Sequence, residues 1–297
     1  NIYPLNSPRW IQKVGERSFS PKQWYLGKVV FSNEVFKEAI LDIKAGLSAL
    51  NGQSRKLLVV DLDETLWGGV VGEVGWEGIT LGGHDALGEA YIDFQRALKG
   101  LKKRGVLLAI ASKNDESVAL EALSKHTEMV LRPNDFVAMR IDWNDKAQNI
   151  ADLVTELNLG LQSTVFIDEN PFERGRVRES LSEVLVPDWP ENPMLYVKAL
   201  EELRCFDTTD LTEEDLKRHS MYLSERWRED TKVLKLSHDE WLETLQLIII
   251  IEPLKANQMK RIVQLINKTN QMNLRTRRMT AEELHEWCSG ANRHFWT

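Results

Sequence analysis

Five short apolar runs, separated by segments with helical spacing, constrain the fold of this chain more than any other feature of its sequence. The runs span residues 56–60, 106–111, 129–131, 164–167 and 183–186. A strand buried on both faces is apolar throughout, whereas a half-exposed strand alternates between apolar and polar residues. Strands that alternate with helical segments of about ten or more residues form parallel βαβ units. We therefore predict an α/β fold with a Rossmann-like parallel sheet over residues 52–190.

Three helices are expected between these strands. The first runs from Tyr91 to Leu101, where apolar residues recur at helical spacing, and Gly105 follows as a C-terminal cap. Asp115 is expected to cap the second helix, and the third covers residues 146–157. These helices are expected to cover both faces of the parallel sheet.

Two segments flank this domain before residue 246. Residues 1–51 are expected to form a lead-in segment and one helix that begins at Asn33. Residues 191–245 are expected to form a helical linker, with a capping pattern of Thr212 and Asp215 at the start of its long helix.

The last segment, residues 246–297, is expected to be an α+β segment with a strand over residues 247–251. A helix with an apolar stripe follows, and Thr280 with Glu283 forms a capping box before a second helix. From Lys255 onward eight basic residues oppose three acidic ones, so this part carries +5 and the rest of the chain −12. The change in charge supports a boundary near residue 250.

The composition excludes several classes of protein. The net charge of −7 argues against a nucleic-acid-binding protein, which presents a concentrated basic face. The longest aliphatic run, residues 247–251, is five residues long, whereas a membrane-spanning helix needs about 20. Cys205 and Cys288 belong to no disulfide or zinc pattern. We therefore expect a cytoplasmic protein without a membrane span and without a nucleic-acid partner.

Polar residues directly follow three of the predicted strands, and the carboxyl ends of parallel strands lie at one edge of a sheet. Lys146 opens the helix before the 164–167 strand, where it can reach the same edge. The residues that follow the strands are Asp61, Asp63 and Thr65 after the first, Ser112, Lys113 and Asn114 after the second, and Asp168 and Glu169 after the fourth.

This set of side chains has the chemistry of phosphoryl transfer. Two neighbouring carboxylates repel each other unless a cation lies beside them, and a hard divalent ion prefers oxygen ligands. A hydroxyl, an ammonium group and an amide at the start of a helix suit an anion such as phosphate. Carboxylates in excess beside phosphate-binding groups are the residue types that phosphoryl transfer through an aspartate nucleophile requires.

The order D-x-D-x-T, Ser, Lys and a double acid resembles the haloacid dehalogenase (HAD) superfamily of phosphotransferases over residues 57 to about 175. The resemblance implies that Asp61 is the nucleophile that forms an aspartyl phosphate, and that Asp63 is the acid and base. It implies that Lys146 neutralises charge on the nucleophile and the phosphate. Glu169 stands where Asp is more usual in this superfamily.

The resemblance also implies a substrate-binding set and a Mg²⁺ site. The substrate-binding residues would be Thr65, which supports the loop, and Ser112, Lys113 and Asn114. The Mg²⁺ ligands would be Asp61, the main-chain carbonyl of Asp63, Asp168 and Glu169.

Three longer strings, residues 61–70, 166–174 and 266–271, are similar to the FkbH-like family. The glycine-rich stretch between Thr65 and Tyr91 is too short for a cap domain. The resemblance implies a capless HAD domain that takes a glyceryl unit from 1,3-bisphosphoglycerate, releases phosphate and loads an acyl carrier protein as a thioester. It also implies that the C-terminal segment is the start of an acetyltransferase-like domain. The implied partners are a phosphorylated small molecule and an acyl carrier protein.

Two other functions are compatible with the same residues. A simple HAD phosphatase would use water as its only acceptor, and a non-catalytic HAD-like scaffold would bind a partner without turnover. A scaffold need not retain all the acidic residues, the serine and the lysine, which speaks against it. Trp67 would either line the substrate entrance or close the flap, and Glu173 with Arg174 would serve the site, pair with each other or cap a helix.

Overall fold

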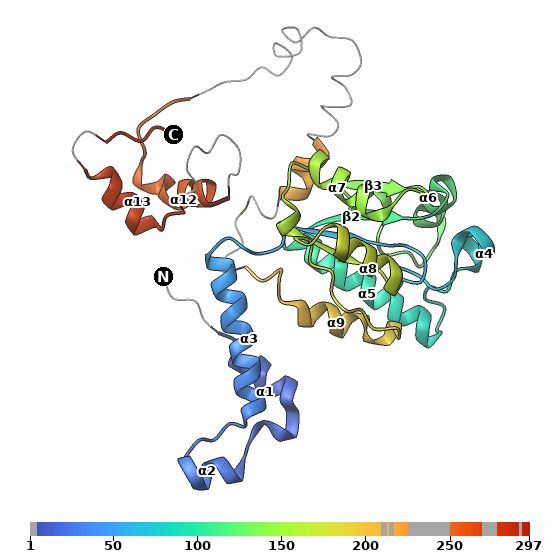
Figure 1. The fold of residues 1–297 in the computed structure, drawn as a ribbon, viewed down its shortest axis with the longest axis horizontal. Coiled ribbons are helices and arrows are strands. Elements are labelled where there is room, and N and C mark those ends of the chain that lie inside the picture. Colours follow the sequence, from blue (N-terminus) through green and yellow to red (C-terminus); the bar gives the residue numbers. More distant parts are fainter. Residues whose placement is uncertain (1–4, 209–212, 214–216, 225–249, 269–277, 291–292) are drawn as a thin grey trace. The chain divides into compact units, whose positions relative to one another are not determined.

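The computed structural model describes the chain apart from residues 1–4, 209–212, 214–216, 225–249, 269–277 and 291–292 (Figure 1). Its contacts divide it into two compact units, Asn1–Arg226 and Trp227–Thr297. The first unit contains the sheet and all the residues expected at the site.

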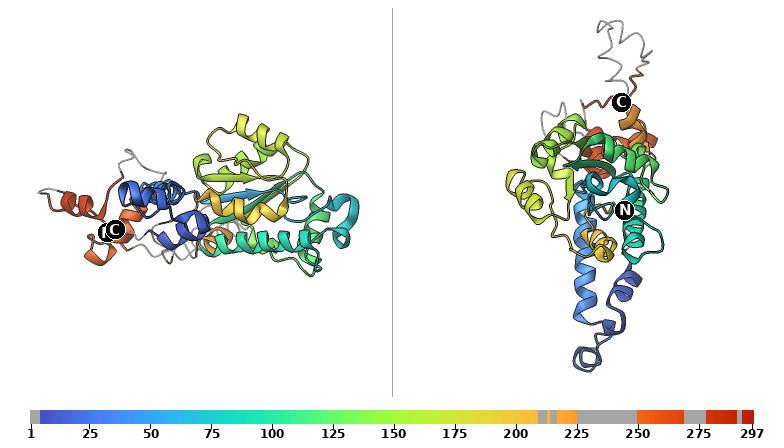
Figure 2. Two further views of the ribbon diagram at one scale, coloured as in Figure 1. Left: turned by 90° about the horizontal axis from the view of Figure 1, so that it is seen from below. Right: turned by 90° about the vertical axis from the view of Figure 1, so that its right-hand side faces the viewer.

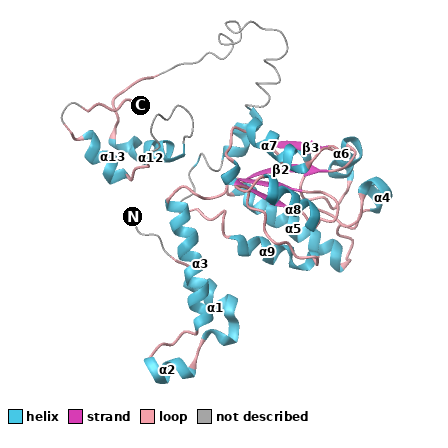
Figure 3. Ribbon diagram, in the orientation of Figure 1, coloured by secondary structure: helices cyan, strands magenta, loops and turns pink. Residues whose placement is uncertain are grey.

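Four parallel strands in the order β3-β2-β1-β4 form the sheet, which Figure 3 shows among the helices that cover it. Val60, the last residue of β1, pairs with Ile110 on one side and with Ile167, the last residue of β4, on the other. The predicted Rossmann-like parallel sheet is therefore confirmed. The strands are β1 (Leu57–Val60), β2 (Leu107–Ser112), β3 (Ala138–Ile141) and β4 (Thr164–Ile167).

Two of the five predicted strands are wrong. Residues 129–131 form a loop whose side chains are largely buried, and Gln95 Oε1 accepts hydrogen bonds from two of its N–H groups. The third strand is instead β3, an edge strand whose middle residues are half-exposed, so it lacks a continuous apolar pattern. Residues 183–186 contribute one isolated bridge, from Leu185 to Val165. A loop whose apolar side chains are buried by packing has the same sequence pattern as a short buried strand.

Helices cover both faces of the sheet (Figure 2). Side chains alternate along β1, so Leu58 and Val60 face the core formed with α5, α6 and α9, whereas Leu57 and Val59 face α7 and α8. The helices of this part are α4 (Val71–Gly78), α5 (Ala86–Lys103), α6 (Glu116–Lys125), α7 (Lys146–Glu156), α8 (Pro171–Ser180), the 3₁₀ helix η4 (Pro193–Leu195) and α9 (Tyr196–Leu203).

The expected helix ends around β2 are confirmed. Asp115 caps α6 by accepting hydrogen bonds from the N–H groups of Ser117 and Val118. Gly105 follows α5 with a φ of 85°, a left-handed conformation that suits glycine. Helix α5 begins five residues before the predicted start, because the side chain of Asp85 caps its first turn.

The segment before β1 contains more helix than expected. Helices α1 (Ser7–Val14) and α2 (Pro21–Gly27) precede the predicted helix, α3 (Asn33–Leu50). Arg204, which follows α9, donates hydrogen bonds to the main-chain carbonyl of Glu38 and to the side chains of Glu38 and Asp42 on α3. These buried ion pairs tie α3 to the end of α9.

The second unit contains α12 (Met259–Lys268) and α13 (Ala281–Cys288). The capping box of Thr280 and Glu283 is confirmed at the start of α13. Residues 250–251 are not in a strand, so the strand predicted over residues 247–251 is wrong where it is described. Residues 247–249, residues 269–271 and the predicted capping pair of Thr212 and Asp215 lie outside the described part of the chain. Residues 217–224 of the helix expected after Thr212 are helical. Among the described residues no helix combines the length and apolar character that crossing a membrane requires.

The packed core predicts a large effect of a single truncation. Leu108, the second residue of β2, is fully buried, so Leu108→Ala should destabilise the protein by about 2–5 kcal/mol through the cavity it leaves. Urea denaturation followed by circular dichroism measures this change. Leu87→Ala, at a position 42% exposed, is the matched control and should change stability by less than about 1 kcal/mol. Equal effects of the two variants would contradict the described core.

Candidate functional site

One lysine joins two of the strand ends. The Nζ of Lys146, the first residue of α7, lies 2.6 Å from Asp168 Oδ2 and 3.0 Å from Asp61 Oδ1. Both carboxylates follow neighbouring strands, β1 and β4, whose pairing brings them together. All three side chains are almost completely buried. An ion pair removed from water to this extent requires close partners for each charge.

Carboxylate is in excess in this cluster. Ligand oxygens of Asp61, Asp168 and Glu169 lie within 4.8 Å of one another. Lys146 balances only one of these three negative charges, so the ionised cluster carries a net charge of −2. Asp61 Oδ1 is also buried without an aligned hydrogen bond, although it contacts Lys146 as an ion pair.

The excess charge shifts the ionisation of the cluster. Burial, together with the charges of Asp61 and Asp168, raises the pKa of Glu169 to about 8. Burial and the charge of Asp61 raise the pKa of Asp168 to about 6, although its ion pair with Lys146 opposes this shift. Burial alone would lower the pKa of Lys146, but the carboxylates of Asp61 and Asp168 outweigh it and raise that pKa. The ammonium group therefore stays charged while the carboxylates compete for protons.

The carboxylate of Asp63 is held by three donors from different segments. Its Oδ1 accepts hydrogen bonds from Trp67 Nε1 at 2.8 Å and from the N–H of Val71 at 3.0 Å. Its Oδ2 accepts from Asn114 Nδ2 at 2.7 Å. Burial raises the pKa of Asp63, and these hydrogen bonds oppose the shift. Trp67 is fully buried, so it closes the loop against Asp63 and does not line an entrance.

The four residues expected to bind substrate lie at the same edge, and three of them have protein partners. Thr65 Oγ1 donates to Glu169 Oε2 at 2.7 Å, and the amide of Asn114 is the one that reaches Asp63. Lys113 Nζ lies 2.6 Å from Glu173 Oε1. Ser112, at the end of β2, is buried. The structure thus brings the residues together, and their roles toward a substrate stay predictions.

Arg174 supports the loop after β4 in a way that the sequence does not indicate. Its Nη1 donates to the main-chain carbonyls of Asp168 at 2.8 Å and Glu169 at 2.7 Å. Glu173 contacts Lys113 and does not pair with Arg174. Both hydrogen bonds end on main-chain carbonyls, which every residue has. The sequence therefore contains no complementary side chain that could have predicted these contacts.

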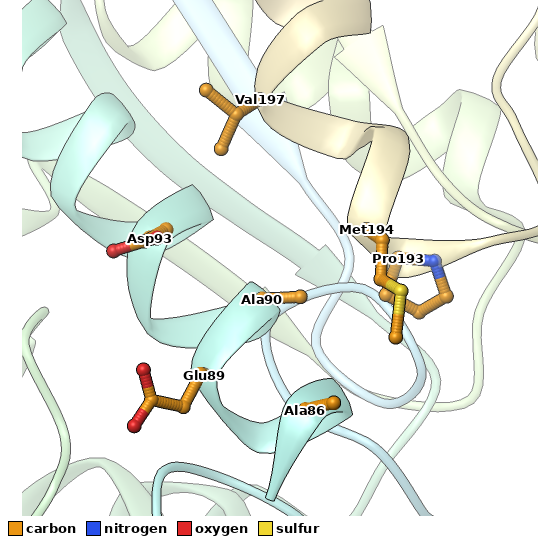
Figure 4. A pocket seen from close by; sticks show the side chains of 7 residues that line it. All are labelled: Ala86, Glu89, Ala90, Asp93, Pro193, Met194 and Val197. Carbon is orange, nitrogen blue, oxygen red and sulfur yellow. The ribbon is translucent and has the colours of Figure 1, made fainter. Parts of the chain in front are cut away.

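A groove elsewhere on the domain contains none of these carboxylates. It lies between α5 and the η4–α9 segment (Figure 4). We therefore place the candidate site at the buried carboxylate cluster rather than in this groove. The groove is lined by Ala86, Glu89, Ala90, Asp93, Pro193, Met194 and Val197.

Comparison with solved structures connects this geometry to a known domain. The chain matches the crystal structure of the N-terminal part of the protein BF1531 from Bacteroides fragilis, which contains a phosphatase domain complexed with Mg. The two share 37% sequence identity with a TM-score of 0.64 over 67% of this chain. The chain spans about half of the solved chain, 54% of its length. No family model matches, and no curated protein does. The fold of this chain is a Rossmann-like parallel sheet of the HAD-like type, as in that phosphatase domain.

The pKa shift of Glu169 predicts how stability depends on pH when no metal is present. Its pKa rises from an ordinary 4.5 to about 8 on folding, so the unfolded state loses this proton first as pH rises. The contribution of Glu169 to stability is therefore full below about pH 4.5 and is lost by about pH 8. Glu169→Gln should become more stable relative to the wild type across this range.

Urea denaturation in the presence of a chelator measures this difference. Glu179→Gln, at an exposed position of α8, is the control and should show no such trend. A difference between wild type and Glu169→Gln that does not change with pH would contradict the burial of this carboxyl.

Proposed function

We propose that this chain is a Mg²⁺-dependent phosphotransferase of the HAD type that acts through an aspartyl phosphate on Asp61. The observation that carries the proposal is the buried cluster in which Lys146 joins Asp61 and Asp168 beside Glu169. The similarity to a phosphatase domain crystallised with Mg supports it. Phosphatase activity is the simplest form of this function, with water as the acceptor.

The residues are suited to a divalent cation. A net charge of −2 on the cluster and the buried Oδ1 of Asp61 without an aligned hydrogen bond both favour a small dication with oxygen ligands. Asp61, Asp168 and Glu169, with the main-chain carbonyl of Asp63, would hold it. When bound, Mg²⁺ supplies charge neutralisation for a phosphoryl group and the nucleophile.

The side chains of the site then divide the reaction into two steps. In the first, an oxygen of Asp61 forms a bond to phosphorus, the bond from phosphorus to the leaving oxygen breaks, and Asp63 gives its proton to that oxygen. In the second, Asp63 takes a proton from water, whose oxygen bonds to phosphorus and releases Asp61. Lys146 stays protonated beside Asp61 and balances negative charge that gathers there.

The remaining residues surround the transferring group. Ser112, the last residue of β2, and Lys113, which follows it, are proposed to bind phosphoryl oxygens, Lys113 by exchanging its contact with Glu173. Asn114 and Thr65 act through Asp63 and Glu169, to which their side chains are bonded. The cytoplasm remains the proposed location, and Cys205 and Cys288 are both free thiols.

Substitution of the nucleophile tests the mechanism. Asp61→Asn removes the nucleophilic charge and should abolish phosphate release from acetyl phosphate in Mg²⁺ while the circular dichroism spectrum stays unchanged. Asp63→Asn should lower kcat by about 10²–10⁴-fold, the range of general acid–base catalysis. Asp188→Asn, at a fully exposed side chain, is the control and should retain wild-type kcat. Wild-type turnover in Asp61→Asn would contradict the proposal.

Metal binding offers a separate test. Mg²⁺ at about 100 times its Kd should stabilise the folded protein by about 2.7 kcal/mol. The thermal shift should be larger at pH 8 than at pH 6, because protons on Glu169 compete with the metal at lower pH. Asp168→Asn should remove most of the shift, whereas Asp188→Asn should not. A melting temperature that is indifferent to Mg²⁺ would instead favour a non-catalytic scaffold.

A more specific function is glyceryl transfer from 1,3-bisphosphoglycerate to an acyl carrier protein, as in the FkbH-like family. The strings that carry this resemblance, residues 61–70 and 166–174, include Asp61, Asp63, Asp168 and Glu169 of the cluster. The chemistry needs a thiol acceptor.

Cys205 is unsuited to be that acceptor. Its main-chain carbonyl accepts a hydrogen bond from Arg55, before β1, whereas Asp61 follows β1 about 20 Å further along the extended chain. Burial also raises the pKa of the Cys205 thiol to about 12, so it is rarely a thiolate. We propose that the acceptor thiol comes from the carrier protein.

Intact-protein mass spectrometry separates these outcomes. The chain with Mg²⁺, 1,3-bisphosphoglycerate and a phosphopantetheinylated carrier protein should add a glyceryl mass to the carrier and release two phosphates. The carrier thiol displaces the phosphate on the acyl carbon, and Asp61 takes the other phosphoryl group and passes it to water. Asp61→Asn should leave the second phosphate in place, so that no glyceryl mass appears on the carrier, and Cys205→Ser should leave the result unchanged. Phosphate release without a gain of carrier mass would show a phosphatase and overturn glyceryl transfer.

A further inference from the structure

Glu64, between Asp63 and Thr65, has an unusual backbone conformation. Its φ is 53°, in the left-handed region that residues with a side chain rarely adopt. The φ of Glu64 sets the orientation of the peptide that joins it to Asp63, including the carbonyl of Asp63. A backbone of this kind persists only where its surroundings hold it.

Three hydrogen-bond donors from outside the D-x-D-x-T string hold Glu64. Tyr196 Oη donates to the main-chain carbonyl of Glu64 at 3.0 Å. Tyr91 Oη donates to Glu64 Oε2 at 3.2 Å and lies 3.4 Å from the same carbonyl oxygen. The N–H of Gly69 donates to Glu64 Oε1 at 2.8 Å. Both the backbone and the side chain of Glu64 are therefore bonded.

The two tyrosines are themselves fixed by packing. Tyr91 comes from α5 and Tyr196 from α9, and both are at most 2% exposed. Their rings meet edge to face with centroids 6.1 Å apart, and the Tyr196 ring also packs on Phe94 and Trp189. A Cβ added at Gly68 would lie 3.0 Å from the Tyr91 ring, so a glycine there allows the close approach. The hydroxyl groups thus point at Glu64 from a rigid aromatic cluster.

We propose that Tyr91 and Tyr196 are positioning residues that hold Glu64 in its left-handed conformation and so fix Asp63 for acid–base catalysis. The proposal rests on the proposed function, because Asp63 is the general acid only in that reaction. Under this proposal α9, which follows the last strand, contributes to the geometry of the site through Tyr196. Neither tyrosine touches the carboxylate cluster in a hydrogen bond of the described structure, so each acts through Glu64.

Kinetics of hydroxyl deletions provide the first readout. Tyr196→Phe keeps the ring and removes one donor, so kcat for acetyl phosphate should fall about tenfold, or roughly 1.4 kcal/mol, with KM changed less than about twofold. Tyr91→Phe should act in the same direction, and the double variant should lose less than the product of both effects, because both bonds end on Glu64. Tyr222→Phe, which removes a hydroxyl on the other face of the sheet, is the control and should retain wild-type kcat.

A spectroscopic readout is independent of turnover. The indole N–H of Trp67 donates to Asp63, so its ¹H–¹⁵N resonance reports the geometry of Asp63. Trp67→Phe assigns this resonance by its disappearance. We expect the resonance to shift in Tyr196→Phe and Tyr91→Phe and to stay in place in Tyr222→Phe.

The two readouts together decide the proposal. A lower kcat with a shifted Trp67 resonance supports it, and any other combination in an active protein overturns it, including a loss of thermal stability alone. If the wild-type protein releases no phosphate, the proposed function fails. In that case an unshifted resonance also overturns the positioning of Asp63, whereas a shifted one supports it.

Discussion

The contact of the Lys146 ammonium group with Asp61 and Asp168 is the interaction on which the site depends. Two carboxylates at the ends of adjacent buried strands would repel each other strongly in a medium of low polarity. Lys146 Nζ lies 2.6 Å from Asp168 Oδ2 and 3.0 Å from Asp61 Oδ1, so its positive charge relieves part of this repulsion. It reaches both carboxylates because α7 begins at the same edge of the sheet. The charge that remains makes the cluster an acceptor for a dication.

A second constraint is the immobility of Asp63. Donors from the loop at Trp67, from the start of α4 and from the end of β2 converge on its carboxylate, and Glu64 beside it is held from α5 and α9. Here the loop and the helices that cover one face of the sheet supply the positioning.

The sequence predicts the cluster because parallel strands end at one edge, so the polar residues after β1, β2 and β4 had to meet. It fails for β3, since Ala138–Ile141 is a half-exposed edge strand, whereas residues 129–131 are apolar through loop packing. Tyr196 lies 132 residues from Glu64, and its bond ends on a carbonyl, so no spacing rule connects them. Contacts to the main chain across distant segments become visible only once the fold is known.

The central claim is that Asp61 carries the phosphoryl group during turnover. Rapid acid quenching of the reaction with Mg²⁺ and acetyl phosphate, followed by peptide mapping in a mass spectrometer, tests it most directly. We expect a gain of one phosphoryl mass at Asp61 on the peptide that contains it, which is discharged when the substrate is consumed. Turnover without a phosphorylated Asp61, or with the phosphoryl group on another residue, would contradict it.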